Sequence, residues 1–386
     1  MKLLVYYADT YLDHDIIDTL STMHIQYNIF KWDFSENIDE LRFEDWMNNQ
    51  FSINDYDAIF SMNYFPMISS YCNDNNIKYI SWCYDSPLSV REIGNTLENL
   101  CNYVFMFDKK MTLGYRSKGF DTVHHLPLGV NCKRMKEIEI NEEDMQKYGS
   151  DISFTGSLCE TNLFFVTSYL DDYLRGYINS LVDIQANIYG YLFLSDVIKD
   201  SVVLKIQQLY GENSGDTAFS FGKDDLVNVM ARETTRKERL MLLNLFGKHH
   251  KMKCYSPTNS GLFDYVEHCD PVDYINEMPK VFRCSKINLN PTLRCIQTGI
   301  PLRAYNIMGS GGFLLSNFQE ELYESYIDGE EFIMYESYAD AAEKVQFYLK
   351  HEELRKKISE RGCVKTLEEH NLKLRLQSIL SMAKIT

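Results

Sequence analysis

The chain has 386 residues, and at roughly 100 to 200 residues per domain this length predicts two packed lobes. Hydrophobic residues make up 45% and charged residues 24%, a composition that excludes a disordered, collagen-like or repetitive chain. The net charge of −16 disfavours nucleic acid as the main partner, because a polyanion would be repelled at long range.

The first residues, MKLLVYYADTYLDHD, do not resemble a signal peptide, because they hold one lysine and an apolar run that Asp9 interrupts. No window approaches the roughly 18 apolar residues of a membrane helix, so we expect no membrane span. The 10 cysteines are scattered without a C-x-x-C pair, which indicates buried thiols in a reducing compartment. We therefore expect a cytoplasmic protein.

Short apolar runs rich in Val, Ile, Tyr and Phe alternate with helix-like stretches in the first part of the chain. They begin at Lys2, Tyr27, Ala58, Lys78, Tyr103 and Thr122. Runs that are apolar throughout suit parallel strands that are covered on both faces. The pattern predicts a doubly wound, Rossmann-like α/β domain over residues 1–148.

A second α/β domain is predicted over residues 149–370, where a new strand signal, DISFTGSL, begins at Asp151. Residues 160–247 contain no proline and carry helical periodicity, which predicts a helical insertion. Strand-like runs then return at Lys251, Lys286 and Gly311. The last residues, 371–386, read as a closing amphipathic helix that could pack on either lobe.

Ligands of open parallel sheets bind at the carboxyl ends of the strands, so residues directly after the strand candidates are the first candidates for a site. They are Asp9, Asn63, Asp85, Asp108, Gly156, Ser256 and Asn290, with the segment 301–312. In that segment Gly309, Gly311 and Gly312 precede the apolar run FLL. These glycines either let the backbone approach a phosphate or let a helix pack against a strand.

Several other site types lack support in the sequence. No glycine-rich turn follows the first strand, which disfavours a nicotinamide oxidoreductase. Asp171 and Asp172 fit a solvated helix face, and the two adjacent histidine pairs lack the i, i+4 spacing of metal ligands. We therefore expect no metal site, and the absence of G-x-S-x-G disfavours a serine hydrolase.

A longer stretch, from Ser285 to Gly362, joins features in a specific order. A strand ends at Asn290, a Gly-Ile-Pro loop follows at Gly299, and then come an arginine-led helix, the turn GSGGFLLSN and a Tyr-Leu-x-His-x-x-x-Arg helix. This order resembles the donor-binding lobe of the CgeB-like (spore maturation protein) glycosyltransferases, relatives of the family 4 enzymes. The helical segment and the motifs WCYDSP and HLPLGVN resemble the same group, so the resemblance covers nearly the whole chain and is strongest from about Glu233.

The resemblance implies the GT-B fold, with two Rossmann-like lobes facing a central cleft and a helical insertion in the second lobe. It implies that the second lobe binds a nucleotide-activated sugar without a metal ion or other cofactor, and that the acceptor enters from the first lobe. Gly156 and Ser157 would face the diphosphate, and Val272 would lie at the base. The loop from Gly299 to Pro301, with Arg303, would lie near the phosphates and the sugar, where a guanidinium can stabilise the leaving group.

The chain departs from the broader family at two positions. That family carries two glutamates eight positions apart, for the donor sugar and the ribose, and this chain has Thr298 and Asn306 there. Asn306 can still bind a ribose hydroxyl. Together with the strand-end candidates, the expected donor-binding residues are Gly156, Ser157, Ser256, Val272, Asn290, Gly299, Ile300, Arg303, Asn306, Gly311 and Gly312.

Asp85, in the turn CYDSP, is the expected catalytic residue, since a carboxylate there could take the proton of an acceptor hydroxyl. The alternative is that Asp85 caps the following helix, ahead of Pro87. Asp9 and Asp108 are further candidates for the catalytic residue. We expect a hexosyltransferase that uses a UDP-sugar and a protein, glycan or small-molecule acceptor. The alternatives are a nucleotide-sugar epimerase and a non-catalytic sugar-nucleotide-binding or scaffold protein.

Overall fold

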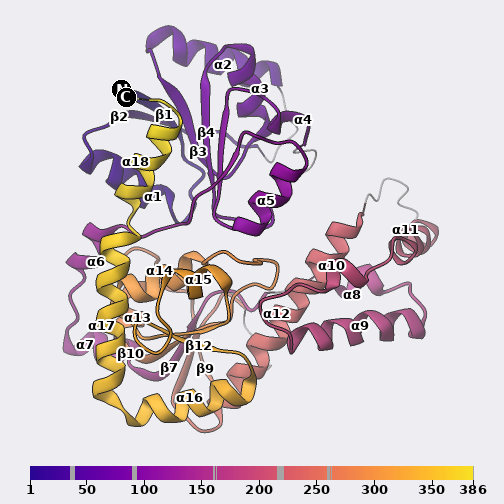
Figure 1. The fold of residues 1–386 in the computed structure, drawn as a ribbon, viewed down its shortest axis with the longest axis vertical. Coiled ribbons are helices and arrows are strands. Elements are labelled where there is room, and N and C mark those ends of the chain that lie inside the picture. The colour runs from indigo at the N-terminus through magenta and orange to yellow at the C-terminus, as the bar shows by residue number, and fades with distance from the viewer. Residues whose placement is uncertain are drawn as a thin grey trace. The chain divides into compact units, whose positions relative to one another are not determined.

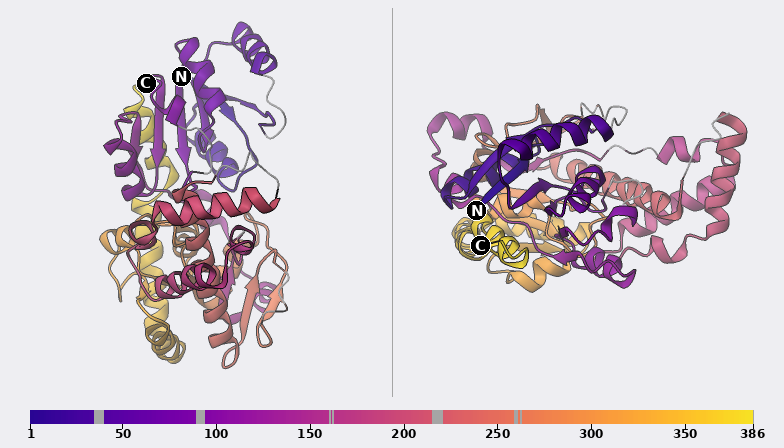
Figure 2. Two further views of the ribbon diagram at one scale, coloured as in Figure 1. Left: turned by 90° about the vertical axis from the view of Figure 1, so that its right-hand side faces the viewer. Right: turned by 90° about the horizontal axis from the view of Figure 1, so that it is seen from above.

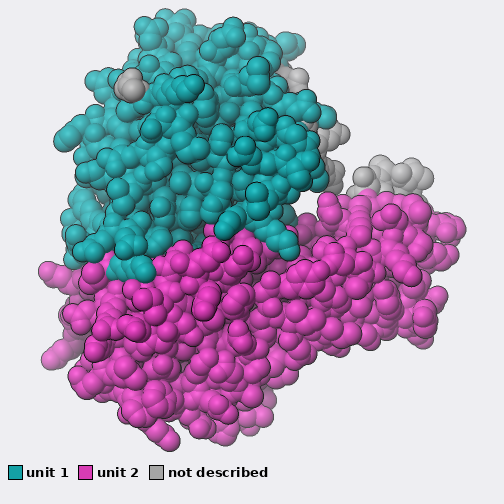
Figure 3. All heavy atoms as spheres, viewed as in Figure 1, with its two compact units in different colours: residues 1–137, 299–305, 365–386 teal, residues 138–298, 306–364 magenta. Residues whose placement is uncertain are grey.

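The computed structural model describes residues 1–34, 40–88, 94–159, 161, 163–214, 221–258, 261 and 263–385. The chain forms two compact units, shown in two colours in Figure 3. Unit 1 comprises residues 1–137, 299–305 and 365–386, and unit 2 comprises residues 138–298 and 306–364. Thr386, the end of the expected closing helix, lies outside the described residues.

Unit 1 contains a six-stranded sheet in the order β2-β1-β3-β4-β5-β6, and all of its strand pairs are parallel. The strands are β1 (Lys2–Tyr6), β2 (Gln26–Phe30), β3 (Ala58–Met62), β4 (Lys78–Cys83), β5 (Asn102–Met106) and β6 (Val123–His125). These are the six strands that the apolar runs predicted. Every side chain of the central strand β3 is buried, as a sheet covered on both faces requires.

The helices of unit 1 lie around this sheet (Figure 1). They are α1 (Asp13–Thr22), α2 (Glu40–Ile53), α3 (Pro66–Asp74), α4 (Gly94–Leu97), α5 (Lys109–Ser117), α6 (Cys132–Glu137) and α18 (Leu372–Met382). Phe43 of α2 and Ile68 of α3 belong to one apolar core with Leu4 and Ile59 of the sheet. The closing helix α18 packs on unit 1, where it lies beside α1 (Figure 1).

Unit 2 contains a second six-stranded parallel sheet, in the order β12-β11-β10-β7-β8-β9. Its strands are β7 (Ser150–Thr155), β8 (Met252–Tyr255), β9 (Glu267–Cys269), β10 (Ser285–Asn290), β11 (Leu314–Asn317) and β12 (Ile333–Tyr335). The sequence predicted four of them and missed β9 and β12. Both missed strands have three residues and lie at the edges of the sheet. The equally short β6 was recognised because it lies in the longer run that begins at Thr122.

Between β7 and β8 the chain is helical, and in Figures 1 and 2 several of these helices extend to one side of the sheet. They are α8 (Leu163–Thr167), α9 (Asp172–Ala186), α10 (Leu194–Val197), α11 (Asp200–Ser214) and α12 (Lys223–Gly247). They enclose an apolar core of their own that includes Ile178, Ile206 and Met230. The last of them, α12, reaches back to β8.

The remaining helices of unit 2 are α7 (Glu142–Tyr148), α13 (Met278–Cys284), α15 (Glu320–Ser325) and α16 (Tyr338–Lys350). Two more, α14 (Leu302–Gly309) and α17 (Glu352–Glu369), continue from one unit into the other. The boundary between the units follows residue 137, before α7, whereas the sequence analysis predicted it after residue 148. The reason is that α7 is attached to α13, where Lys280 Nζ donates to the Asp144 carboxylate at 3.0 Å and the Tyr148 hydroxyl donates to Glu277 at 2.6 Å.

None of the helices in the described part of the chain is both long and apolar enough to span a membrane.

Candidate functional site

The turn after β7 lies at the carboxyl edge of the unit 2 sheet. Gly156 has a φ of +142°, which side chains rarely adopt, and its N–H donates to the Tyr255 carbonyl at 2.9 Å. Ser157 is exposed, and its hydroxyl accepts the Cys159 N–H at 2.9 Å. The structure therefore places the predicted diphosphate turn where ligands of parallel sheets bind.

A buried arginine that the sequence analysis did not single out holds this turn. Arg239 of α12 is 4% exposed, and its Nη1 donates to the Ser157 carbonyl at 2.7 Å while Nη2 donates to the Pro291 carbonyl at 2.9 Å. It therefore joins the loops that follow β7 and β10. Burial lowers the pKa of Arg239, and within the described residues its guanidinium forms no ion pair with a carboxylate.

Asn306 of α14 carries an unsatisfied polar atom. The residue is 3% exposed, its Nδ2 lies 3.4 Å from the Tyr274 hydroxyl, and within the described residues its Oδ1 has no hydrogen-bond partner. Such orphaned atoms are rare, and a missing ligand is one explanation. Tyr274 lies two residues after Val272, which is half-buried against an apolar cluster that includes Tyr255 and Val281. The structure thus links the segment predicted to hold the base with the residue predicted to hold the ribose.

The carboxylate of Glu321 lies beside Thr298, the second position at which the sequence departs from the family. The Thr298 hydroxyl donates to Glu321 Oε1 at 2.8 Å, and the Glu321 N–H donates to the Thr298 carbonyl at 3.0 Å. Both residues are at most 5% exposed. Glu321 follows β11, so its position at this edge depends on the parallel pairing of β10 with β11.

Two predicted donor-binding residues lie at this edge but are buried with partners of their own. Asn290 is 0% exposed, and its Nδ2 donates to the hydroxyls of Thr292 and Ser316. Ser256 is also 0% exposed, and its hydroxyl accepts the Thr258 N–H at 3.3 Å. Their side chains stabilise the loops after β10 and β8 and offer no exposed polar atom to a ligand.

The structure places Gly311 and Gly312 at the opposite edge of the sheet. Both residues precede β11, so they lie at its amino end, away from Gly156. A Cβ atom at Gly312 would lie 2.8 Å from the Phe282 carbonyl oxygen, and Gly311 has a φ of +83°. The packing interpretation of these glycines accounts for both observations, and the structure does not bring them together with the other predicted donor-binding residues.

The loop before α14 belongs to unit 1. A Cβ atom at Gly299 would lie 2.7 Å from the Phe107 ring, so only glycine fits this contact. Ile300 is buried, at 1% exposed. Arg303 is half-buried in the first turn of α14.

In unit 1, acidic residues gather at the carboxyl ends of the strands. Asp85 is exposed after β4, and the Asn63 side-chain amide donates to its carboxylate at 2.8 Å. Asp108 is 0% exposed and caps α5 by accepting the Met111 N–H. Asp13 accepts the N–H groups of Ala8 and Thr10 in the turn after β1, and burial raises its pKa. Asp108 and Asp13 are thus occupied by backbone groups.

Asp85 keeps an exposed carboxylate that a substrate can reach. The capping alternative for Asp85 involves residues 89–93, which lie outside the described residues. Asp9 is also exposed, in a turn with a φ of +61°. Among the described residues no group of three or more His, Cys, Asp or Glu side chains could hold a metal ion.

The two parallel-sheet α/β units have the fold of the GT-B glycosyltransferases. Residues 232–381, less than half of the chain, match a family model described as glycosyl transferase-like. The match runs from α12 to α18. No curated protein matches the chain in sequence.

Several solved structures are similar over their whole length. Anabaena HepE in complex with UDP and glucose has a TM-score of 0.55 at 10% identity, covering 100% of both chains. Sucrose-phosphate synthase from Thermosynechococcus elongatus has a TM-score of 0.56 at 10% identity, covering 100% of this chain and 98% of that one. An Escherichia coli structure titled trehalose-6-phosphate bound with UDP-2-fluoro glucose has a TM-score of 0.54 at 12% identity, covering 100% and 99%.

Proposed function

We propose that this chain is a glycosyltransferase that transfers a hexose from a UDP-sugar to an acceptor hydroxyl. The fold, the glycosyl transferase-like match and the UDP complexes of structurally similar proteins support the proposal. In the chain itself, the observation that carries it is the buried Asn306 Oδ1, which lacks a partner within the described residues. We further propose that the chain is related to the CgeB-like group, works in the cytoplasm and needs no metal ion.

The donor would be bound by the carboxyl edge of the unit 2 sheet. The turn at Gly156 and Ser157, where the Ser157 side chain is exposed, would contact the diphosphate, while the segment from Val272 to Tyr274 and the side chain of Asn306 would contact the nucleoside. The Glu321 carboxylate accepts a hydrogen bond from Thr298, so this part of the proposed site keeps a carboxylate although the family glutamate is absent.

On the acceptor side, Asp85 of unit 1 would act as the general base. Its carboxylate would take the proton of the acceptor hydroxyl as the oxygen forms its bond to the sugar carbon. The bond from that carbon to the diphosphate breaks, and the nucleoside diphosphate leaves with the electron pair. Arg303 would offset the growing negative charge, a type of interaction that can contribute a few kcal/mol.

Thermal unfolding with UDP, GDP, TDP and NAD tests the donor class. A ligand at 100 times its dissociation constant adds about 2.7 kcal/mol of stability, which is easily detected. We expect UDP to raise the melting temperature and NAD to leave it unchanged. The UDP-sugars are then tested for transfer and for interconversion of the free donor, which separates a transferase from an epimerase. Stabilisation by none of the four would contradict the proposal, and binding without turnover would favour a scaffold.

The substitution Asp85→Asn tests the acceptor side. It keeps the size and the hydrogen bond with Asn63 but removes the base, so we expect the transfer rate to fall by roughly 100-fold or more. UDP binding should not change, because Asp85 is not among the residues proposed to contact the nucleotide. Near-normal turnover in this variant would remove Asp85 from the mechanism. The matched variant is Asp9→Asn, which changes another exposed acid in the same unit.

A further inference from the structure

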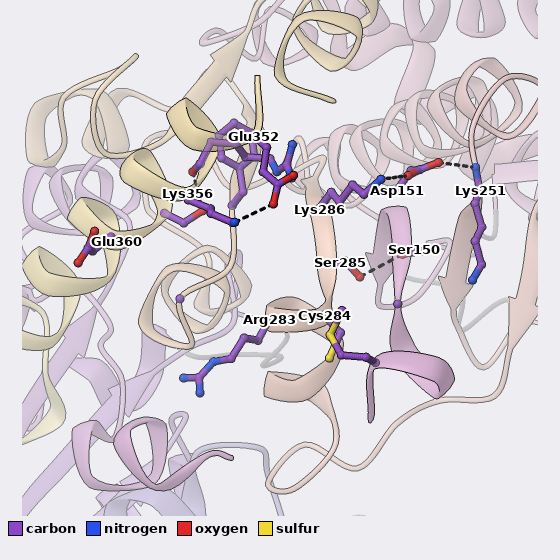
Figure 4. Close-up of a pocket in the computed structure, with 16 residues that line it drawn as sticks. Ser150, Asp151, Lys251, Arg283, Cys284, Ser285, Lys286, Glu352, Lys356 and Glu360 are labelled. Carbon is purple, nitrogen blue, oxygen red and sulfur yellow. Dashed lines mark hydrogen bonds and ion pairs between the residues drawn. The ribbon is translucent and has the colours of Figure 1, made fainter. Parts of the chain in front are cut away.

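Unit 2 contains a cavity of about 600 Å³ at the edge of its sheet opposite to the proposed donor site (Figure 4). Ser150 and Ser285 are the first residues of β7 and β10, and Phe313 directly precedes β11, so these lining residues mark the amino edge of the sheet. Residues of α17 form the other wall. We name this space the amino-edge cavity, and its volume lies within the range of small-molecule sites.

The lining of the amino-edge cavity is basic although the chain is acidic. Five basic and three acidic side chains line it, whereas the whole chain has a net charge of −16. Figure 4 shows two ion pairs among them, between Lys286 and Asp151 at 2.7 Å and between Lys356 and Glu352 at 2.7 Å. These pairs neutralise two of the three acids, and the third is Glu360.

Both paired acids are ionised at neutral pH. The hydrogen bond from Lys356 lowers the pKa of Glu352. At Asp151 burial acts to raise the pKa, but hydrogen bonds from Lys286 and from the Lys251 backbone outweigh it and lower the pKa. The positive charge of the lining therefore exceeds its negative charge across the physiological pH range.

Besides the two ion pairs, the lining contains the basic side chains of Lys251, Arg283 and Arg355 and the acidic side chain of Glu360. Within the described residues neither Lys251 nor Arg355 forms an ion pair with a carboxylate. Arg355 is 7% exposed, and its Nη1 donates to the Tyr348 carbonyl at 2.7 Å. Glu352 and Asp151 act on Arg355 electrostatically, but within the described residues its guanidinium hydrogen-bonds a carbonyl and no carboxylate. A buried guanidinium with this environment favours an anionic ligand, because the attraction is little screened by water.

The cavity also offers neutral hydrogen-bonding groups. The hydroxyls of Ser150 and Ser285 lie 3.1 Å apart at one wall, so one donates to the other and the second keeps its proton for a further oxygen atom. Phe313 and Met145 add apolar surface beside them. Two excess positive charges, serine hydroxyls and space beyond the size of an ion match a phosphate monoester on a small organic molecule.

We propose that the amino-edge cavity binds a small phosphorylated metabolite, a phosphate monoester, at a site separate from the proposed donor site. The proposal does not depend on the glycosyltransferase function. The phosphate would lie between Arg355, Lys251 and the two serines, and the organic part would contact Phe313 and Met145.

The first experiment titrates inorganic phosphate and glycerol 3-phosphate into the full chain by calorimetry, at constant ionic strength and with UDP in excess to occupy a nucleotide site. Lys251→Gln and Arg355→Gln should each raise the dissociation constant about tenfold or more, because each removes a charge-assisted hydrogen bond. The matched control is Lys237→Gln, which changes a half-buried lysine of the same unit that is paired with Asp183. It should bind phosphate like the wild type.

A second measurement applies if Arg355→Gln fails to fold. Reductive methylation of the wild-type lysines, followed by mass spectrometry, should show that phosphate protects Lys251 and leaves Lys237 unchanged. Two results would overturn the proposal: binding no stronger than that of chloride at equal ionic strength, or equal labelling of Lys251 with and without phosphate. A failure of UDP to bind would count against the proposed function and not against this site, because Lys251→Gln and Arg355→Gln would still weaken the binding of phosphate.

Discussion

A substitution of Asn306 can separate the effect of its buried Oδ1 on ligand binding from its effect on the stability of the fold. An unpaired buried polar atom costs about 1–3 kcal/mol, and a ribose hydroxyl would supply the missing donor. We predict that Asn306→Leu leaves the free energy of unfolding unchanged or raises it, because the orphaned atom is removed. The dissociation constant of UDP should rise about tenfold or more. Urea unfolding and calorimetry measure the two effects.

The control for this substitution is Asn187→Leu, which changes an exposed asparagine of the same unit at the end of α9. It should leave UDP binding unchanged. If Asn306→Leu also binds UDP like the wild type, Asn306 does not contact the nucleotide, and the observation that carries the proposed function is lost.

Arg239 is a positioning residue whose charge can act on the diphosphate. Its guanidinium is buried behind the Gly156–Ser157 turn and hydrogen-bonds only carbonyl groups among the described residues. We predict that Arg239→Met weakens the binding of UDP about tenfold more than that of uridine, which lacks the diphosphate. Arg239→Lys keeps the charge and should show a smaller difference between the two ligands. Calorimetry with both ligands measures it.

If the role of Arg239 were purely structural, Arg239→Met would weaken the binding of UDP and the binding of uridine equally. Circular dichroism must first show that both variants are folded, since a buried arginine that joins two loops contributes to stability as well.

At the scale of elements, the connection between α17 and α18 contains a histidine that makes stability depend on pH. His370 is 8% exposed, its ring lies against Tyr305, and Arg375 Nη2 lies 2.8 Å from its Nδ1. Burial, with Arg375 and Lys365 nearby, lowers the pKa of His370 to about 4. The unfolded chain, with a histidine pKa of about 6.5, therefore binds the proton more readily than the folded chain.

Because the folded pKa is depressed, the contribution of His370 to stability is complete above about pH 6.5 and is lost as the pH falls towards 4. We predict that acidification from pH 7.5 to pH 5 costs about 2 kcal/mol through this residue. His370→Gln should lose less stability over the same interval, as measured by urea unfolding at both pH values. An identical pH dependence in the two proteins would contradict the prediction.

The strands show which parts of the fold can be predicted from sequence. The six strands of unit 1 and four of unit 2 lie in apolar runs that can be recognised, although β6 itself has only three residues. The edge strands β9 and β12 have three residues each, and their pairing is fixed by neighbouring strands that are distant in sequence. The place of α7 in unit 2 likewise depends on its contacts with α13, and no local sequence pattern encodes these contacts.

Position after a strand predicted one part of the candidate site, and the family resemblance pointed to Val272 and Asn306. Ser157 and Asp85 are exposed near strand ends and Gly156 is half-buried, whereas Ser256 and Asn290 follow strands but are completely buried. Strand-end position cannot reveal whether the next loop covers a side chain. Arg239 and Glu321 were missed because their contacts join elements that only the tertiary fold brings together. A charged residue in an amphipathic helix gives no local sign that it is buried.

At the scale of the whole molecule, unit 1 is assembled from distant parts of the chain. Its C-terminal segment, residues 365–386, joins it through α18, and the Leu372 N–H donates to the Val130 carbonyl at 2.9 Å. Unit 2 lies between these segments in sequence and has its own apolar core. Unit 1 therefore cannot complete its core until nearly the whole chain is present.

Substitutions in α18 should accordingly destabilise unit 1 more than unit 2. Leu376 and Ile379 are 1% and 0% exposed, and truncating such a side chain to alanine costs about 2–5 kcal/mol. In hydrogen exchange we expect Leu376→Ala and Ile379→Ala to lower the protection of β1, β3 and β4, while β7 and β10 keep theirs. Leu374→Ala on the same helix, where the side chain is 41% exposed, should change neither. Equal loss of protection in both sheets would instead mean that the two units unfold as one cooperative body.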